Sequence, residues 1–201
     1  MGLYSRNKGK RGERLWASFC REQGYDVHRT AQYRGNTGAA GDVEGLPLVH
    51  CEVKFVQNLN IRKAMEQSQH DALLEWKRMQ EEAPEGISVM NTFPIVASKR
   101  SGEPWLVTMY AWNFMRLAAV AEDGTLGRLH VLHKASQRFS VRKCLREAKE
   151  SYKDAAALVA IKYLRGYSAS LVTMYADDWF TLYREWEAGM DLKRRAEREE
   201  H

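Results

Sequence analysis

Apolar residues recur at helical spacing in two parts of the first half of the chain and predict amphipathic helices there. The segment 12–23 is followed by Gly24, a residue type common just after a helix end. Its apolar stripe is formed by Leu15, Trp16, Phe19 and Cys20. The segment 61–82 predicts a longer helix, and the residues before it offer Asn58 and Asn60 as N-caps.

Short apolar runs predict strands between and after these helices. One strand is expected over 25–29. The segment 41–54 predicts two short strands around a Gly-Leu-Pro turn, and apolar residues dominate 48–55, as in a strand buried on both faces. Two further runs, 94–99 and 105–109, predict the strands that close the same sheet.

Three charged residues lie within the apolar segment 41–54: Asp42, Glu52 and Lys54. Buried charges cost free energy unless they are paired or bound to a metal. Two carboxylates on neighbouring strands can hold a hard divalent cation, and Lys54, two residues after Glu52, points to the same face of its strand. Such a group could position a water for attack on a phosphodiester and stabilise the transition state. The alternative is that all three are ordinary surface charges on edge strands.

This arrangement resembles the PD-(D/E)xK nuclease superfamily, with Gly41-Asp42 in place of Pro-Asp and Glu52-Val53-Lys54 as the E-x-K element. Further features of the resemblance are an acid, Glu13, near the start of the first helix and Gln67 on the helix after the lysine strand. Over roughly residues 5–120, the order of elements resembles the archaeal-type and phage Holliday junction resolvases. The resemblance implies an α/β, restriction-endonuclease-like fold with a mixed central sheet flanked by helices.

The same resemblance implies a metal-dependent endonuclease that hydrolyses DNA phosphodiesters at branched structures such as four-way junctions. Asp42 and Glu52 would bind Mg²⁺, for which Mn²⁺ substitutes, and the carbonyl of Val53 would be a further ligand. Lys54 would orient or activate the water, and Glu13 would support the metal shell. The alternative for Glu13 is a first-turn glutamate stabilised by the helix dipole. Because resolvases make two symmetric cuts, the resemblance also implies a homodimer.

Positive charge is concentrated near the N-terminus. Residues 1–35 hold eight Lys or Arg against three Asp or Glu, whereas the rest of the chain holds 23 of each sign. Lys and Arg displace counterions from phosphates, so this basic segment predicts DNA binding; the alternative is a solvated N-terminus. The expected DNA contacts come from this segment, from the glycine-rich loop 30–40 and from the helix 61–82. They are Lys8, Lys10, Arg11, Arg29, Tyr33, Arg34, Arg62, Lys63 and Gln67.

The second half of the chain repeats parts of the first half. The hexapeptide Leu-Val-Thr-Met-Tyr-Ala at 106–111 recurs unchanged at 171–176. A shift of 80 residues also lays 50–68 over 130–148 without a gap. Further along, we expect 96–99 to correspond to 159–162. These matches predict a partial duplication of the sheet and its crossover helix.

The second copy lacks the candidate chemistry, because Leu132 stands in place of Glu52 and Lys134 has no carboxylate partner. We therefore expect it to be structural or DNA-binding. A helix with an acidic first turn should follow its last strand, with an apolar stripe of Trp179, Phe180, Leu182, Tyr183 and Trp186. The expected domains are a nuclease core over 1–120, a degenerate half-repeat over 121–190 that packs on the core or at a dimer interface, and a charged tail over 191–201.

Composition narrows the class of protein. No apolar run approaches the ~18–20 residues that a bilayer-spanning helix needs, and no signal-peptide core follows Met1, so no membrane partner is expected. The three cysteines lack metal-ligand spacing and predict free thiols in a reducing compartment, which favours a cytoplasmic protein encoded by a bacterium or a phage. Two alternatives stay open: a restriction- or repair-like nuclease of the same superfamily, and a DNA-binding scaffold without catalysis.

Overall fold

A computed structural model of the 201-residue chain describes residues 3–30, 40–87, 89–119, 129–133, 140–152, 157–163 and 170–199. The protein is α/β, and its strands form both parallel and antiparallel pairs. It divides into two compact units, residues 1–108 and 109–201. None of the helices in the described part of the chain is long and apolar enough to cross a membrane.

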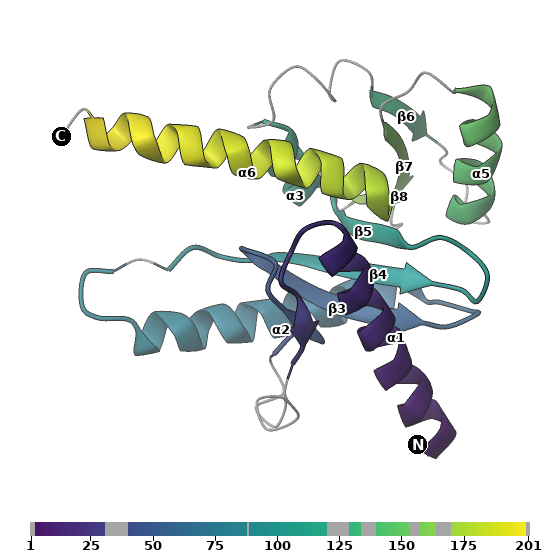
Figure 1. The fold of residues 1–201 in the computed structure, drawn as a ribbon, viewed down its shortest axis with the longest axis horizontal. Helices are drawn as coiled ribbons and strands as arrows, with labels where there is room; N and C mark the ends of the chain where they lie inside the picture. Colours follow the sequence, from purple (N-terminus) through teal and green to yellow (C-terminus); the bar gives the residue numbers. More distant parts are fainter. Residues whose placement is uncertain are drawn as a thin grey trace. The chain divides into compact units, whose positions relative to one another are not determined.

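The first unit contains a mixed sheet and two long helices (Figure 1). Its elements in chain order are α1 (Leu3–Glu22), β1 (His28–Arg29), β2 (Val43–Glu44), β3 (Val49–Phe55), α2 (Ile61–Glu82), β4 (Phe93–Lys99) and the start of β5 (Leu106–Tyr110). Strands β1, β2 and β3 pair antiparallel in that order, and β4 lies parallel to β3 on its other side. The mixed sheet expected from the sequence is therefore present.

Helix α2 has the predicted bounds, and its predicted N-cap is confirmed. The Lys63 N–H donates to the Asn60 side-chain oxygen over 3.1 Å, which satisfies one of the free donors at the helix start. Buried residues of α2 recur at helical spacing and face the sheet; they are Ala64, Met65, Ser68 and Ala72. The exposed His70 takes no part in this contact.

Two predicted boundaries near the N-terminus were wrong. Helix α1 begins at Leu3 rather than at residue 12, so Lys8, Lys10 and Arg11 lie on a helix. The strand expected over 25–29 is reduced to β1, because the chain before it is turned back on itself. There the Tyr25 N–H donates to Cys20 O and the Val27 N–H donates to Tyr25 O, so these groups are not available to a sheet.

The two helices lie on opposite faces of β3, as alternation along a strand requires. On one face, α1 packs so closely that a Cβ added at Gly12 would lie 2.6 Å from the Phe55 Cβ. The same side holds Trp16, which is fully buried and lies with its ring centroid 5.0 Å from that of Trp105. On the other face lies α2 (Figure 1), and its Glu75 and Gln67 bond to the polar side chains His50 and Lys54 of β3. Both faces of β3 are thus covered, as predicted.

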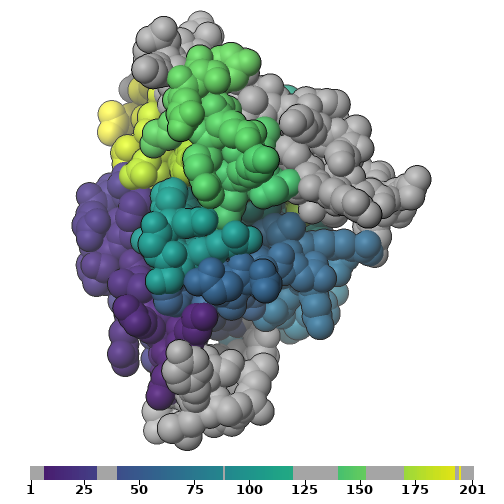
Figure 2. Space-filling model, turned by 90° about the vertical axis from the view of Figure 1, so that its right-hand side faces the viewer, coloured from purple at the N-terminus to yellow at the C-terminus, as the bar shows by residue number. Residues whose placement is uncertain are grey.

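Among its described residues, the second unit contains three further strands with helices. After β5 come α3 (Ala111–Ala118), β6 (Leu129–His133), α5 (Val141–Ser151), β7 (Ala157–Tyr163), β8 (Ser170–Tyr175) and α6 (Ala176–Glu199). Strand β7 lies parallel to β6 and antiparallel to β8. Helix α5, which is green in Figure 2, buries Leu145 and Ala148.

Helix α6 confirms the predicted apolar stripe. It begins directly after β8 with Asp177 and Asp178 in its first turn, as the helix dipole favours. All five aromatic and aliphatic residues of the stripe are buried, and the rings of Trp179 and Tyr183 stack with centroids 4.7 Å apart. The helix continues to Glu199, so residues 191–199 of the expected charged tail form the last turns of α6.

The same order of elements occurs twice along the chain, as β3-α2-β4-β5-α3 and then as β6-α5-β7-β8-α6. Both copies of the hexapeptide end a buried strand and lead straight into a helix. One predicted correspondence is off by one residue. Cys51 pairs with Ile95 and Val131 pairs with Val159, so at the shift of 80 residues Ile95, not Val96, is the counterpart of Val159. The duplication itself stays a prediction.

Candidate active site

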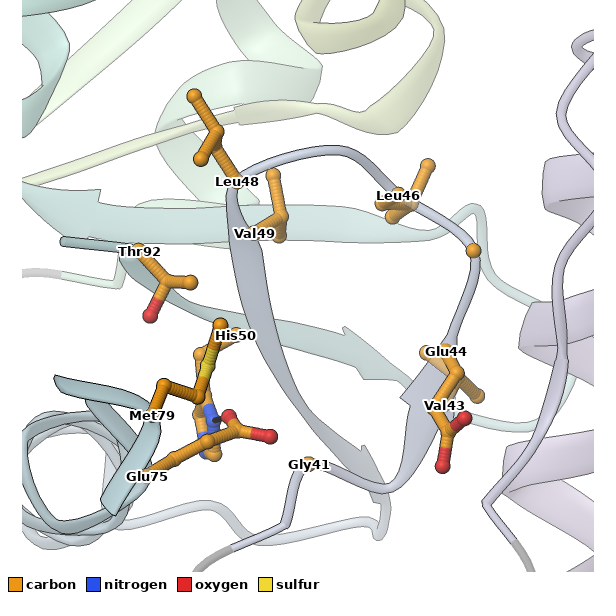
Figure 3. A pocket seen from close by; sticks show the side chains of 11 residues that line it. Gly41, Val43, Glu44, Leu46, Leu48, Val49, His50, Glu75, Met79 and Thr92 are labelled. Atoms are coloured by element: carbon orange, nitrogen blue, oxygen red, sulfur yellow. Dashed lines mark hydrogen bonds and ion pairs between the residues drawn. The ribbon is translucent and has the colours of Figure 1, made fainter. Parts of the chain in front are cut away.

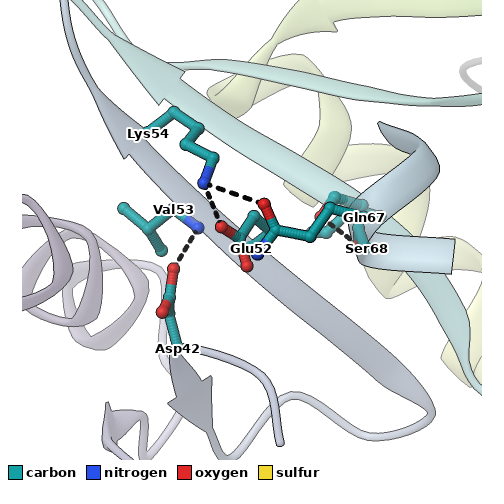
Figure 4. A network of polar contacts seen from close by, with 7 residues as sticks. Asp42, Glu52, Val53, Lys54, Gln67 and Ser68 are labelled. Atoms are coloured by element: carbon teal, nitrogen blue, oxygen red, sulfur yellow. Dashed lines mark hydrogen bonds and ion pairs between the residues drawn. The ribbon is translucent and has the colours of Figure 1, made fainter. Parts of the chain in front are cut away.

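Asp42 lies at the edge of β3, just before β2. Its N–H donates to Cys51 O over 2.9 Å, and its Oδ2 accepts the Val53 N–H over 2.7 Å (Figure 4). Thr30 holds this segment from the other side, since its N–H donates to Asp42 O and its hydroxyl donates to Gly41 O over 2.6 Å. A Cβ at Gly41 would lie 3.1 Å from Cys51 O, so the residue before Asp42 has little room for a side chain.

Glu52 and Lys54 point to the α2 face of β3. The Lys54 Nζ donates to Glu52 Oε1 and, over 3.4 Å, to the side-chain oxygen of Gln67 (Figure 4). Glu52 is only 7% exposed, so its carboxylate is largely removed from water. Ser68 fixes α2 against the sheet next to these residues, because its hydroxyl donates to Ile95 O of β4 over 3.1 Å. The predicted neighbours Glu52, Lys54 and Gln67 are therefore brought together.

Glu13 approaches the same region from α1. Its carboxylate forms an ion pair with Arg29 of β1, and both side chains are mostly buried. Arg29 was predicted to contact phosphate, and the structure places its guanidinium against Glu13. Because the negative charge of Glu13 also acts on Asp42, the predicted third acid of the site lies close enough to influence that carboxyl.

The electrostatics of the site are expressed most strongly at Asp42. The pKa of this carboxyl is raised from 3.8 to about 7, first by its burial and then by the neighbouring charge of Glu52. The Val53 N–H acts in the opposite direction, Glu13 again raises the pKa, and Lys54 lowers it. A carboxyl that resists ionisation among other acids is typical of functional sites.

The donor atoms of the site fit a hard divalent cation. Asp42 and Glu52 offer carboxylate oxygens, the ligand type that Mg²⁺ and Mn²⁺ prefer. A cation would also offset the mutual repulsion that raises the pKa of Asp42. Among the described residues, no three or more His, Cys, Asp or Glu side chains are already arranged to hold a metal ion together. Glu13 and Glu52 are instead ion-paired, with Arg29 and Lys54.

The predicted DNA contacts lie on several elements of the first unit. On α1, Lys8 lies 5.8 Å from the centre of the Phe55 ring, Lys10 is partly buried and Arg11 is exposed. On α2, the exposed Arg62 pairs with Glu66 over 2.9 Å, and Lys63 is exposed. Tyr33 and Arg34 lie outside the described residues.

Two residues next to this site were missed by the sequence analysis. His50 lies two positions before Glu52 on the same face of β3, and its Nδ1 is 2.9 Å from Glu75 Oε2 of α2 (Figure 3). His50 is buried, with 2% exposure. Its place on the face of Glu52 could have indicated His50 from the sequence, but no local pattern pointed to Glu75, 25 residues further along.

Comparison of the chain with models of protein families, with curated proteins and with solved structures finds no match.

Proposed function

We propose that the protein is a metal-dependent endodeoxyribonuclease that hydrolyses phosphodiesters of branched DNA. The observation that carries this proposal is the pair of neighbouring carboxylates on β3 and just before β2, with Asp42 hydrogen-bonded on both sides of Glu52 and Lys54 bonded to Glu52. The raised pKa of Asp42 supports it, because such a carboxyl gains most from a bound cation.

The side chains divide the reaction among them. Asp42 and Glu52 would hold Mg²⁺, with the Val53 carbonyl as a further ligand. The ion supplies positive charge that polarises the phosphate and the attacking water. Lys54, now paired with Glu52, would face the phosphate and offset its charge once Glu52 served as a metal ligand. Glu13, held by Arg29, supports the negative field of the site.

The hydrolysis step exchanges one phosphorus–oxygen bond for another. The water oxygen forms a bond to phosphorus while the bond to the leaving sugar oxygen breaks, and the electron pair leaves with that oxygen. The water loses one proton to solvent, and the leaving oxygen gains one from solvent, so no redox partner is needed. Lys54 stabilises the charge that builds up on the phosphate oxygens during this exchange.

Branched DNA as substrate rests on the resemblance to Holliday junction resolvases, supported by the basic residues of α1. Lys8, Lys10 and Arg11 lie on the same helix as Glu13, within the first unit. A polyanionic substrate gains from such charge beside a metal site. We include a homodimer in the proposal, because a four-way junction needs two symmetric cuts.

The test is a Mg²⁺-dependent cleavage assay on a four-way junction, a flap and a linear duplex of matched sequence. Cleavage of the junction alone supports the resolvase proposal. Preferential cleavage of the flap or the linear duplex would instead favour a repair- or restriction-like nuclease. DNA binding without cleavage in Mg²⁺ or Mn²⁺ would overturn the proposed activity and favour a DNA-binding scaffold.

A further inference from the structure

A pocket of about 190 Å³ lies beside the candidate active site, in the first unit. We call it the His50 pocket. Its polar lining comes from Glu44, His50, Glu75 and Thr92, and its apolar walls include Val43, Val49 and Met79 (Figure 3). Gly41 also lines it, so the pocket reaches the residue next to Asp42.

Two buried polar atoms of the pocket lack a hydrogen-bond partner among the described residues: His50 Nε2 and Thr92 Oγ1. Leaving such atoms unpaired costs free energy. Both side chains lie on the same face of the sheet, because Val49 pairs with Phe93 and the two residues flank that pair on neighbouring parallel strands. The pocket is therefore short of a polar group that would satisfy both atoms.

The hydrogen-bonding pattern defines what the missing group must offer. The Glu75 carboxylate accepts from His50 Nδ1–H, so in the neutral ring Nε2 is an acceptor. Glu44 and Glu75 add carboxylates, which repel phosphate and accept N–H donors. With a volume of about 190 Å³ and the apolar side chain of Met79 beside His50 and Glu75, the pocket suits a flat group that carries an N–H₂ donor on its edge (Figure 3).

We propose that the His50 pocket binds the nucleobase of the nucleotide next to the cleaved phosphodiester, through the exocyclic amino group of that base. This inference rests on the proposed nuclease function. His50 and Glu52 are two residues apart in one strand, or about 7 Å. Because the Lys54 ammonium bonds to Glu52, that spacing suits a phosphate at this ammonium with the base of the same or the adjacent nucleotide at His50.

The amino group makes the proposal selective. Adenine, cytosine and guanine carry an exocyclic N–H₂ group, whereas thymine presents a carbonyl oxygen and a methyl group instead. The pocket should therefore bind the first three bases and discriminate against thymine. In cleavage, the same preference should be seen as faster cutting where the base beside the scissile phosphate is not thymine.

The direct test is titration of the full-length protein with each 2′-deoxynucleoside, followed by the NMR signals of the His50 ring. We expect saturable shifts with deoxyadenosine, deoxycytidine or deoxyguanosine, and none with thymidine. Equal shifts with thymidine, or no shifts with any nucleoside, would overturn the proposal. Displacement of the nucleosides by spermidine or arginine at lower concentration would also overturn it, in favour of a cationic ligand.

Thr92→Val separates binding from folding, because it keeps the shape of the side chain and removes only the unpaired hydroxyl. We expect nucleoside binding to weaken by roughly three- to tenfold while the melting temperature stays equal or rises. The matched control is Thr181→Val on α6, whose hydroxyl bonds to Asp177 O on its own helix and which should not affect binding. Unchanged binding in Thr92→Val would count against the pocket.

The two proposals fail separately. Asp42→Asn should abolish cleavage and keep nucleoside binding, since Asp42 does not line the pocket. A protein that binds nucleosides at His50 but cuts no DNA would refute the nuclease and support the pocket. A protein that cuts DNA without any nucleoside or base preference would refute the pocket alone.

Discussion

Asp42 is hydrogen-bonded on both sides of Glu52, to the carbonyl of the residue before it and to the N–H of the residue after it. The backbone thus fixes two acids beside each other in a mostly buried place, and their repulsion is part of why the pKa of Asp42 is raised. The arrangement costs stability while no cation is bound. A site that is costly when empty and relieved by a cation is what the proposed activity requires.

The first prediction concerns the stability of the metal-free protein. The Asp42 carboxyl ionises near pH 3.8 when unfolded and near pH 7 when folded, so stability is lost as pH rises from about 4 to about 7. Asp42→Asn removes this loss, and its amide oxygen can still accept the Val53 N–H. We expect the variant to be more stable by roughly 1–3 kcal/mol at pH 8 and unchanged at pH 4, by thermal unfolding in EDTA. Equal stability at pH 8 would contradict the raised pKa.

A second prediction concerns the metal. Because Asp42 must lose its proton to bind a cation, Mg²⁺ affinity should rise between pH 6 and pH 8. The rise in melting temperature on adding Mg²⁺ should therefore be larger at pH 8 than at pH 6, and absent in Asp42→Asn. A Mg²⁺ effect that is independent of pH, or that survives in the variant, would place the cation elsewhere.

Chemistry and DNA binding should separate at Lys54. We expect Lys54→Ala to reduce cleavage by at least ~100-fold, the lower range for loss of a charge-stabilising group, and to leave DNA affinity within about threefold. The matched control is Lys77→Ala, an exposed lysine of α2. Cleavage rates and DNA affinity measured on one junction substrate give both readouts. Near-normal cutting by Lys54→Ala would remove the residue from the site.

The contact between α1 and β3 can be tested with two glycines of the same helix. A Cβ at Gly12 would lie 2.6 Å from the Phe55 Cβ, whereas one at Gly9 would meet only Glu13 Oε1 at 3.8 Å. Gly9→Ala should be neutral or stabilise by up to ~1 kcal/mol through helix propensity. Gly12→Ala should destabilise by about 1–3 kcal/mol and lower cleavage, because it displaces the helix that carries Glu13. Denaturant unfolding compares the two, and equal effects would argue against the close packing.

The basic segment can be tested through the salt dependence of DNA binding. Replacing Lys10, Arg11 and Arg34 with alanine should weaken binding and reduce the slope of log affinity against log salt by up to about three phosphate-equivalents. Binding isotherms at several salt concentrations, with and without the substitutions, give this slope. An unchanged slope would make these charges a feature of solubility alone.

Local signals in the sequence account for much of the fold. The bounds of α2 were predicted because the apolar pattern and the Asn60 cap both lie within or next to the segment. Helix α1 was predicted too short, because its apolar stripe begins at Leu15 and residues 5–14 carry no apolar side chain that would mark a helix face. Close packing on Phe55 makes a small residue at Gly12 necessary. The counterpart of Val159 was predicted as Val96 and is Ile95 at the shift of 80 residues. This error arose because strand register is decided by pairing with the partner strand, which the local sequence does not show.

Strand alternation was enough to predict the part of the candidate site that lies on the two neighbouring strands. Glu52 and Lys54 share a face by spacing alone, and the hydrogen bond from Val53 to Asp42 joins the two predicted strands. The pairings of His50 with Glu75 and of Arg29 with Glu13, which join distant elements, were not predicted. Glu75 bonds to His50 across the sheet–helix contact, and Arg29 turns to Glu13 rather than outward. Such pairings depend on how helices cover the sheet, which no local pattern states.

The repeated hexapeptide has a consequence for how the chain folds. In the unfolded state, 106–111 and 171–176 are chemically identical competitors for any strand that either could join. The six repeated residues cannot distinguish the correct copy during pairing, so the distinction must come from residues outside them. The helices that follow provide one such difference, since Trp112 and Asn113 come after one copy and Asp177 and Asp178 after the other. Exchanging those two dipeptides would leave every strand residue unchanged, yet it should change how often the two copies mispair during folding.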